Sequence, residues 1–214
     1  MLEGIDGSGK GTQAALLAER ARDAGMSVET ISFPTYDGNP FADAIAGYLN
    51  GEFGTADEVH PELAALLYAA DRFHARPGLL DAIVTHDLVI CDRYVASNAA
   101  HQGAKLKGEE RQRLLDWLEA VEYGEFGLPR PDVVVLLDTP VPLARTLVAR
   151  KGERGYTTLE ADIHEADTAH TTATREVYLE LAARDNWRVV TTADENGELR
   201  DVDEIANEIW ESAR

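Results

Sequence analysis

The chain alternates short runs of apolar, often β-branched residues with longer amphipathic stretches. The runs have the length of buried strands, and the stretches carry apolar residues three or four positions apart, as helices do. Strands are predicted at residues 27–33, 88–91, 132–138 and 188–192. Helices are predicted at residues 11–24, 41–49, 61 to about 83, 109–122, 141–150, 167–184 and 202–213. This alternation predicts an α/β fold in which helical crossovers join parallel strands.

Glycine and proline positions indicate where the predicted helices end, break or bend. Gly25 is expected to end the first helix, and Pro77 is expected to break or bend the third, because proline lacks the N–H that a helix interior needs. We find no repeat, low-complexity tract or linker composition in the sequence. A single domain over residues 1–214 is therefore expected.

The composition is that of an ordinary globular domain with a packed core, since 44% of the residues are hydrophobic and 28% are charged. No apolar run approaches the roughly 18 residues that span a bilayer, and no charged-then-apolar signal peptide is recognisable. We expect a cytoplasmic protein that is not a membrane protein. The single cysteine, Cys91, lies in an apolar run, so a structural role in a buried strand is expected.

The charge balance is strongly acidic, with 39 Asp and Glu against 20 Lys and Arg and a net charge of −19. Such a surface repels nucleic acids and anionic membranes, so neither is an expected partner. It resembles the surface of halophilic proteins, in which concentrated salt screens self-repulsion. The alternative is an ordinary acidic cytosolic enzyme. Any site for a phosphate must be built locally from arginines, backbone amides and helix ends.

Residues 4–12, Gly-Ile-Asp-Gly-Ser-Gly-Lys-Gly-Thr, have the composition of a phosphate-binding loop at the start of a helix. Glycines let backbone N–H groups face an anion, the helix N-terminus adds positive partial charge, and Lys10 can bridge the outer phosphates. The Ser or Thr that usually follows the lysine is Gly11, and a hydroxyl arrives one residue later in Thr12. The Gly-Lys-Gly-Thr-Gln string resembles adenylate kinases, which favours a nucleotide kinase. The expected ATP-binding residues are Gly4, Asp6, Gly7, Ser8, Gly9, Lys10, Gly11 and Thr12.

A strand of about five residues normally precedes such a loop. Here only Met1, Leu2 and Glu3 precede Gly4. Either the strand begins upstream of Met1 or it is unusually short. The sequence alone leaves both possibilities open.

Asp92 and Arg93 follow the apolar run of residues 88–91, where a buried strand is expected to end. Parallel sheets bind ligands at the carboxyl ends of their strands. Asp92 can act on Mg²⁺ from the second shell or orient the attacking phosphate, and Arg93 can bind an acceptor phosphate with two hydrogen bonds. The pair is therefore predicted to form the second half of the site.

Residues 92–103, Asp-Arg-Tyr-Val-Ala-Ser-Asn-Ala-Ala-His-Gln-Gly, resemble the signature of thymidylate kinases, and residues 4–10 resemble their phosphate loop. Residues 33–36, 68–72 and 162–165 are similar to three further motifs of that family. The resemblance implies a P-loop NTPase fold, a three-layer αβα sandwich with a central parallel sheet of about five strands and a mobile lid. It also implies transfer of the γ-phosphate of ATP to dTMP with Mg²⁺, in a homodimer.

The resemblance implies roles for the matching positions of an acceptor-binding region at about residues 33–103. Tyr68 would stack on thymine, Arg72 would donate to a base carbonyl, and Asn98 would meet the ring N–H. The expected dTMP contacts are Asp6, Phe33, Tyr36, Tyr68, Arg72, Arg93, Ser97, Asn98 and His101. Without the resemblance, Tyr68 would be predicted as a core residue and Asp71 with Arg72 as a solvated ion pair.

Three positions depart from the family pattern. Thr35 stands where arginine is frequent, and His101 and His164 stand where tyrosine is common. The phosphate contacts are unaffected by these changes. Sugar discrimination and substrate affinity are the properties they put in doubt.

Phosphoryl transfer to a phosphate needs alignment and positive charge rather than a general base, because the acceptor is already anionic. The loop interior holds no basic residue, whereas residues 150–154 hold three cations at the start of a predicted lid, about residues 150–165. The expected catalytic residues are Lys10, Arg93, Arg150, Arg154 and Asp92, with Lys151 as a further candidate. The expected Mg²⁺ ligands, some acting through water, are Asp6, Asp92, Thr12 and Glu165. Otherwise the cations of residues 150–154 stabilise the end of a helix.

Other functions use parts of the same pattern. A deoxynucleoside kinase or an adenylate kinase would share the loop and the Asp-Arg pair. A regulatory NTP switch would share the loop, but the Asn-Lys-x-Asp motif of guanine-specific switches is missing from the sequence. A zinc enzyme is disfavoured, because His164-Glu165 lacks the second histidine of a helical zinc motif.

Overall fold

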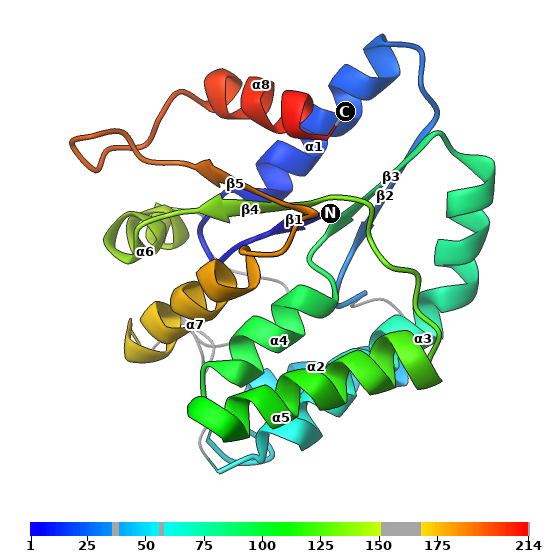
Figure 1. The fold of residues 1–214 in the computed structure, drawn as a ribbon, viewed down its shortest axis with the longest axis vertical. Helices are drawn as coiled ribbons and strands as arrows, with labels where there is room; N and C mark the ends of the chain where they lie inside the picture. The colour runs from blue at the N-terminus through cyan, green and yellow to red at the C-terminus, as the bar shows by residue number, and fades with distance from the viewer. Residues whose placement is uncertain (36–38, 56–57, 151–167, 214) are drawn as a thin grey trace.

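The computed structural model describes residues 1–35, 39–55, 58–150 and 168–213. Its centre is a sheet of five parallel strands in the order β2-β3-β1-β4-β5 (Figure 1). The strands are β1 (Leu2–Glu3), β2 (Val28–Ser32), β3 (Leu88–Asp92), β4 (Val134–Asp138) and β5 (Trp187–Thr191). The predicted parallel sheet is confirmed, and the four longer strands lie within two residues of their predicted limits.

The first strand is short. β1 holds two residues, and Leu2 pairs with Asp92 of β3 and with Val135 of β4. Met1 extends the pairing, because its amino group donates to the Val133 carbonyl at 2.7 Å and its own carbonyl accepts from the Val135 N–H at 2.8 Å. β1 therefore joins the two halves of the sheet through few hydrogen bonds.

Helices cover both faces of the sheet (Figure 1). Helices α1 (Lys10–Asp23) and α8 (Val202–Ser212) pack on one face. On the other face lie α4 (Val95–Gly103) and α7 (Thr168–Leu181), followed outward by α3 (Pro61–Thr85), α5 (Gly108–Leu118) and α2 (Pro40–Leu49). The remaining α-helix, α6 (Val141–Arg150), follows β4. The arrangement is a three-layer αβα sandwich.

Strand β4 shows why its sequence is apolar throughout. Val135 and Leu137 belong to the apolar cluster of α1 and α8, whereas Val134 and Leu136 belong to the cluster of α4 and α7. Successive side chains of a strand point to opposite faces, so a strand covered on both faces is apolar at every position. Cys91 of β3 is also buried, and burial raises the pKa of its thiol to about 11. Its structural role is therefore supported.

Two helical features differ from prediction. Residues 95–103 form α4, which the apolar pattern did not predict, because most of this helix is buried and it carries small or polar residues. Helix α3 continues through Pro77 without a break, and it changes direction along its length (Figure 1), in agreement with the other expected outcome, a bend. Residues 119–125 form the π-helix η1 (Glu119–Glu125) directly after α5, where one α-helix was predicted. Gly25 follows α1 with a φ of 86° and ends it as predicted.

No described helix is both long enough and apolar enough to cross a membrane.

Candidate functional site

The phosphate loop connects β1 to α1 and packs against α6. Gly7 has a φ of 82°, and a Cβ at this position would lie 2.2 Å from the carbonyl oxygen of Ala144. Any larger residue would therefore push the loop away from α6. Gly9, the residue before α1, has a φ of 86°, which is also a conformation that favours glycine. The glycines thus allow the loop to turn between the strand and the two helices.

Lys10 folds back onto this loop. Its Nζ donates to the carbonyl oxygens of Gly4 at 2.9 Å and Ile5 at 2.8 Å, and to the hydroxyl of Ser8 at 3.3 Å. The side chain is buried. Burial, together with the nearby charge of Arg93, lowers the pKa of Lys10 from 10.5 to about 8. The loop's own oxygens therefore accept hydrogen bonds from a buried ammonium group.

Asp92 ends β3 beside the loop. A Cβ added to Gly11 would lie 3.4 Å from Asp92 Oδ2, so Gly11 leaves room for this carboxylate next to the first turn of α1. The other oxygen, Oδ1, is buried and accepts no hydrogen bond from any described residue. A buried carboxylate oxygen without a partner is costly and favours a ligand such as a cation or a water molecule. Thr12, which follows Gly11 in the same turn of α1, is exposed.

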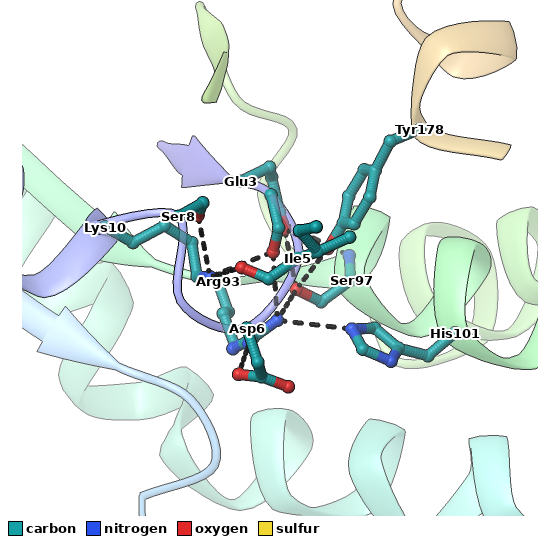
Figure 2. Close-up of polar contacts among 10 residues, drawn as sticks. Glu3, Ile5, Asp6, Ser8, Lys10, Arg93, Ser97, His101 and Tyr178 are labelled. Atoms are coloured by element: carbon teal, nitrogen blue, oxygen red, sulfur yellow. Dashed lines mark hydrogen bonds and ion pairs between the residues drawn. The ribbon is translucent and has the colours of Figure 1, made fainter. Parts of the chain in front are cut away.

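Arg93 faces the same loop (Figure 2). Its Nη2 donates to Asp6 Oδ1 at 2.5 Å, and its Nη1 donates to the Gly4 carbonyl at 3.5 Å and to Ser97 Oγ at 3.2 Å. His101 Nε2 lies 3.4 Å from the same Nη1. Arg93 has a φ of 67° and is the only non-glycine residue of the described chain in the left-handed region. Such a conformation is unfavourable for an L-residue and is common at functional sites.

Glu3 holds this segment in place. Its carboxylate is buried and accepts from the Tyr94 N–H at 2.8 Å, the Ser97 N–H at 3.2 Å, the Ser97 hydroxyl at 2.6 Å and the Tyr178 hydroxyl at 2.9 Å. The carboxylate therefore caps the N-terminus of α4, where negative charge is favourable. Sequence reasoning missed Glu3. The available signal was a carboxylate between apolar residues directly before the loop.

A second cluster of polar side chains lies farther along α3 and α4. Arg72 is buried and donates to Glu122, with Nε 2.5 Å from Oε2 and Nη2 2.8 Å from Oε1. Asn98 Nδ2 donates to Glu122 Oε1 at 2.9 Å and to the Ala65 carbonyl at 2.9 Å. Arg72 is not part of a solvated ion pair with Asp71, since both side chains are buried. Glu122 was not predicted, because nothing near it in the sequence marks it.

Tyr68 is half-buried on α3, and its ring meets the buried Tyr48 ring edge-on with centroids 6.4 Å apart. One side of Tyr68 is thus supported by the core formed between α2 and α3. Tyr68 therefore packs against this core without being fully buried in it.

The turn after β2 is tied to α3 by Asp71. The Asp71 carboxylate accepts from the Thr35 N–H at 3.1 Å, the Thr35 hydroxyl at 2.6 Å and Asn39 Nδ2 at 2.6 Å. Phe33 is buried against Tyr94, with ring centroids 5.6 Å apart. The Phe33-Pro34 peptide bond is cis. These contacts bring the predicted Phe-Pro turn to the segment that carries Arg93.

Several predicted positions lie outside the described residues. These are Tyr36 of the Phe-Pro turn and Lys151, Arg154, His164 and Glu165 of the predicted lid. Arg150 is described, and it lies exposed at the end of α6.

The cationic side chains of Lys10 and Arg93 therefore face one loop, beside a buried cluster of polar side chains on α3 and α4. Gly4, Asp6 and Ser8 of the loop contact Lys10 or Arg93, and Ser97 contacts Arg93 from the first turn of α4. Ser97 and Asn98 are neighbours, so the same turn of α4 reaches both groups. Among the described residues, no three His, Cys, Asp or Glu side chains are grouped so that they could bind a metal ion by themselves.

Comparisons with known proteins give one consistent family. The family model described as thymidylate kinase matches residues 2–204. A thymidylate kinase of Mycobacterium tuberculosis (strain H37Rv) is 37% identical over 202 residues, which cover 92% of this chain and 93% of the relative. A thymidylate kinase of Rhodopseudomonas palustris (strain CGA009) is 34% identical over 213 residues, 99% of this chain and 86% of the relative. Among solved structures, thymidylate kinase from Candida albicans superposes with a TM-score of 0.74 and 25% identity, covering 98% of this chain and 88% of that one.

Proposed function

The chain belongs to the thymidylate kinase family, with a P-loop NTPase fold, and we propose that the site described above transfers the γ-phosphate of ATP to dTMP through the residues predicted from the sequence. The reaction yields dTDP and ADP. Family membership supports the activity itself, and the geometry supports the assignment of roles to individual residues.

The shared contact of Lys10 and Arg93 with Gly4 is the observation that carries the proposal. Lys10 and the loop amides bind the phosphates of ATP, and Arg93 binds the phosphate of dTMP. Both phosphates are anionic, so their approach requires positive charge between them. The dTMP phosphate oxygen then attacks the γ-phosphate without a general base. The bonds from Lys10 and Arg93 to protein oxygens keep both cations in place before the substrates bind.

The cluster of polar side chains on α3 and α4 binds the base. Tyr68 supplies an aromatic surface for thymine, Arg72 donates to a base carbonyl, and Asn98 accepts from the ring N–H. One observation supports the last role: Asn98 Oδ1 is buried and accepts no hydrogen bond from any described residue. Phe33, Tyr36, Ser97 and His101 complete the proposed acceptor site, with Asp6 near the sugar.

Mg²⁺ accompanies ATP in the proposed reaction. Asp92 fits this role, because its unpartnered carboxylate oxygen lies beside the loop, and Thr12 and Asp6 supply further oxygens. Mg²⁺ prefers oxygen ligands and water, and it would neutralise charge on the phosphates. Glu165 stays a candidate ligand from the predicted lid. Dialysis against EDTA, followed by readdition of Mg²⁺, tests the requirement.

The catalytic cations of the lid are proposed to be Arg150 and Arg154, with Lys151 as a third candidate. The contact between Gly7 and Ala144 supports this proposal, because it fixes α6, the helix that ends at Arg150, against the phosphate loop. A cation following α6 would then lie within reach of bound ATP. Closure of such a lid excludes water, so the acceptor phosphate attacks the γ-phosphate in place of water.

A homodimer is proposed through α3. Four of its exposed apolar residues, Leu63, Leu66, Phe73 and Val84, recur at intervals close to whole helical turns and so share one face. Contiguous exposed apolar surface commonly marks an interface, and the family resemblance favours a second copy as the partner. Sedimentation velocity tests the assembly, and Leu66→Arg is expected to give monomers.

We further propose a cytoplasmic enzyme from a salt-rich cell, without a nucleic-acid partner. The substrates are intracellular nucleotides, and the net charge of −19 suits a surface screened by salt and repels polyanions. Cell fractionation and a DNA-binding assay test the first and last parts.

A coupled assay of ADP formation tests the proposed function. ATP is offered with dTMP, dUMP, dCMP or AMP as the acceptor, at low and high KCl, with an acceptor-free reaction as the control for hydrolysis. dTMP is expected to be the preferred acceptor. Preference for AMP, or ADP formation that is independent of any acceptor, would reject the proposal in favour of an adenylate kinase or an NTP switch.

A further inference from the structure

Three buried polar side chains from distant segments meet in one cluster. Arg72 comes from α3, Asn98 from α4 and Glu122 from η1, and each is at most 3% exposed. Arg72 and Glu122 are separated by 50 positions in the sequence. Glu122 is fully buried and bonds to both of the other side chains. The π-helical turn that carries Glu122 is a rare element that occurs often at functional sites.

The Asn98 amide can take only one orientation in this cluster. Its Nδ2 lies 2.9 Å from the Ala65 carbonyl oxygen and 2.9 Å from Glu122 Oε1, and both of these atoms can only accept hydrogen bonds. A flipped amide would set its oxygen against two acceptors. The nitrogen therefore stays with these partners, and Oδ1 is left as a pure acceptor that is buried without a partner among the described residues.

Arg72 is oriented by the same carboxylate. Two parallel hydrogen bonds, at 2.5 and 2.8 Å, fix the plane of its guanidinium group. These bonds use Nε and Nη2, and among the described residues no hydrogen bond is seen for Nη1, so its N–H groups remain as donors. The cluster thus offers one unpaired acceptor, on Asn98, and unpaired donors, on Arg72.

An acceptor beside a donor matches one class of pyrimidine. Thymine and uracil present an N3–H donor next to the O4 acceptor, whereas cytosine presents the N3 acceptor next to an amino donor. Cytosine would therefore leave Asn98 Oδ1 facing a lone pair and the Arg72 N–H groups facing an amino group. Sites built from buried, specifically paired polar groups reject such a substrate strongly.

We infer that Glu122 sets the preference of this site for thymine and uracil over cytosine, by fixing the Asn98 amide and the Arg72 guanidinium in the orientations that read the pyrimidine edge. Glu122 is a positioning residue, since it reaches the base only through its two partners. This inference rests on the proposed function, because it requires that the base lies against Asn98 and Arg72.

Glu122→Gln tests the inference by the ratio of kcat/KM for dTMP to that for dCMP. The neutral amide has one acceptor oxygen where the carboxylate has two, so it cannot keep all three bonds to Arg72 and Asn98, and it also loses the negative charge. The ratio is therefore expected to fall by about tenfold or more. The dTMP-to-dUMP ratio is expected to stay unchanged, because these bases share the same edge. A ratio of kcat/KM values does not depend on the fraction of folded enzyme, so partial unfolding does not mimic the effect.

Two further variants complete the experiment. Glu125→Gln changes an exposed carboxylate of the same η1 segment and is expected to keep both ratios. Glu122→Asp keeps the charge but shortens the side chain, and it replaces Glu122→Gln if that variant does not fold; its dTMP-to-dCMP ratio is also expected to fall.

The outcomes separate the two proposals. An unchanged dTMP-to-dCMP ratio, or an equal fall in the dTMP-to-dUMP ratio, overturns the role of Glu122. A native chain that phosphorylates none of the three pyrimidine nucleotides rejects the proposed function itself.

Discussion

Lys10 and Arg93 donate to the same atom, the carbonyl oxygen of Gly4, at 2.9 Å and 3.5 Å. The two side chains come from α1 and from the segment after β3, and are brought together because β1 lies beside β3 in the sheet. The cation proposed to bind the donor nucleotide and the cation proposed to bind the acceptor are thereby held on one loop.

Arg93→Ala is predicted to abolish this pairing of charges. Without the guanidinium, nothing holds the acceptor phosphate beside the loop, and kcat/KM for dTMP should fall by about a thousandfold or more. Arg130→Ala is the matched control, since Arg130 is exposed and pairs with Glu119, and it should leave activity within about twofold of the native value. Steady-state kinetics measure both, with thermal unfolding to check the fold. Near-normal turnover in Arg93→Ala would remove Arg93 from the mechanism.

Asp71→Ala is predicted to weaken acceptor binding without affecting the nucleotide donor. The change leaves the Thr35 N–H and Asn39 Nδ2 without their partner, so the turn that carries Phe33 should loosen and stability should fall by about 2 kcal/mol. KM for dTMP should rise several-fold while KM for ATP stays constant. Thr35→Val removes only the contacts of the hydroxyl, with Asp71 and Asn39, and should have a smaller effect. Equal changes in both KM values would show that Asp71 acts on the whole fold.

The lid cations are predicted to act on turnover. Arg154→Ala and Arg150→Ala should each lower kcat more than either KM, because charge on the migrating phosphoryl group matters most in the transition state. The control is Arg113→Ala, an exposed residue of α5. If kcat is unchanged in Arg154→Ala, the catalytic charge belongs to Arg150 or Lys151. If kcat is also unchanged when Arg150 and Lys151 are each replaced by alanine, the basic segment stabilises a helix end instead.

Whether a feature of the fold or the site could be predicted from the sequence depends on how far apart its interacting residues lie along the chain. The loop and the strand-end pair of Asp92 and Arg93 carry their signal within a few positions, and the structure places them at adjacent strand ends. Glu3 and Glu122 carry no such local signal. Glu3 bonds to Tyr178, 175 positions away, and Glu122 bonds to Arg72, 50 positions away, so their roles exist only once the chain has folded.

Helix α4 illustrates the same limit at the level of secondary structure. Its residues are buried on more than one side, so they do not show the alternation of apolar and polar positions that predicts a surface helix. Its N-terminal N–H groups are capped by the carboxylate of Glu3, 91 positions earlier than Tyr94, and no capping residue precedes it in sequence. A cap supplied by another strand cannot be recognised from local sequence.

Salt is predicted to stabilise the enzyme. The chain has 39 acidic and 20 basic residues, which gives a net charge of −19. Repulsion among the acidic side chains weakens as added salt shortens the screening length. The melting temperature should therefore rise by about 5 °C or more between low and molar KCl. An equal osmolality of sucrose is the control for effects other than screening. No rise in KCl beyond that in sucrose would contradict adaptation to a salt-rich cell.

ATP affinity is predicted to fall as the pH rises above about 8, where Lys10 loses its proton in the free enzyme. The pKa of Lys10 is lowered from 10.5 to about 8 by burial and by the charge of Arg93, and bound phosphates would stabilise the ammonium form and raise that pKa. Binding should therefore take up a proton above pH 8, and the dissociation constant should increase by at most about tenfold per pH unit. Calorimetric titrations in buffers of different ionisation enthalpy measure both quantities, and Lys10→Met, which binds weakly, should show neither. Constant affinity of the native enzyme up to pH 9.5, without proton uptake, would mean that Lys10 does not contact the nucleotide as an ammonium group.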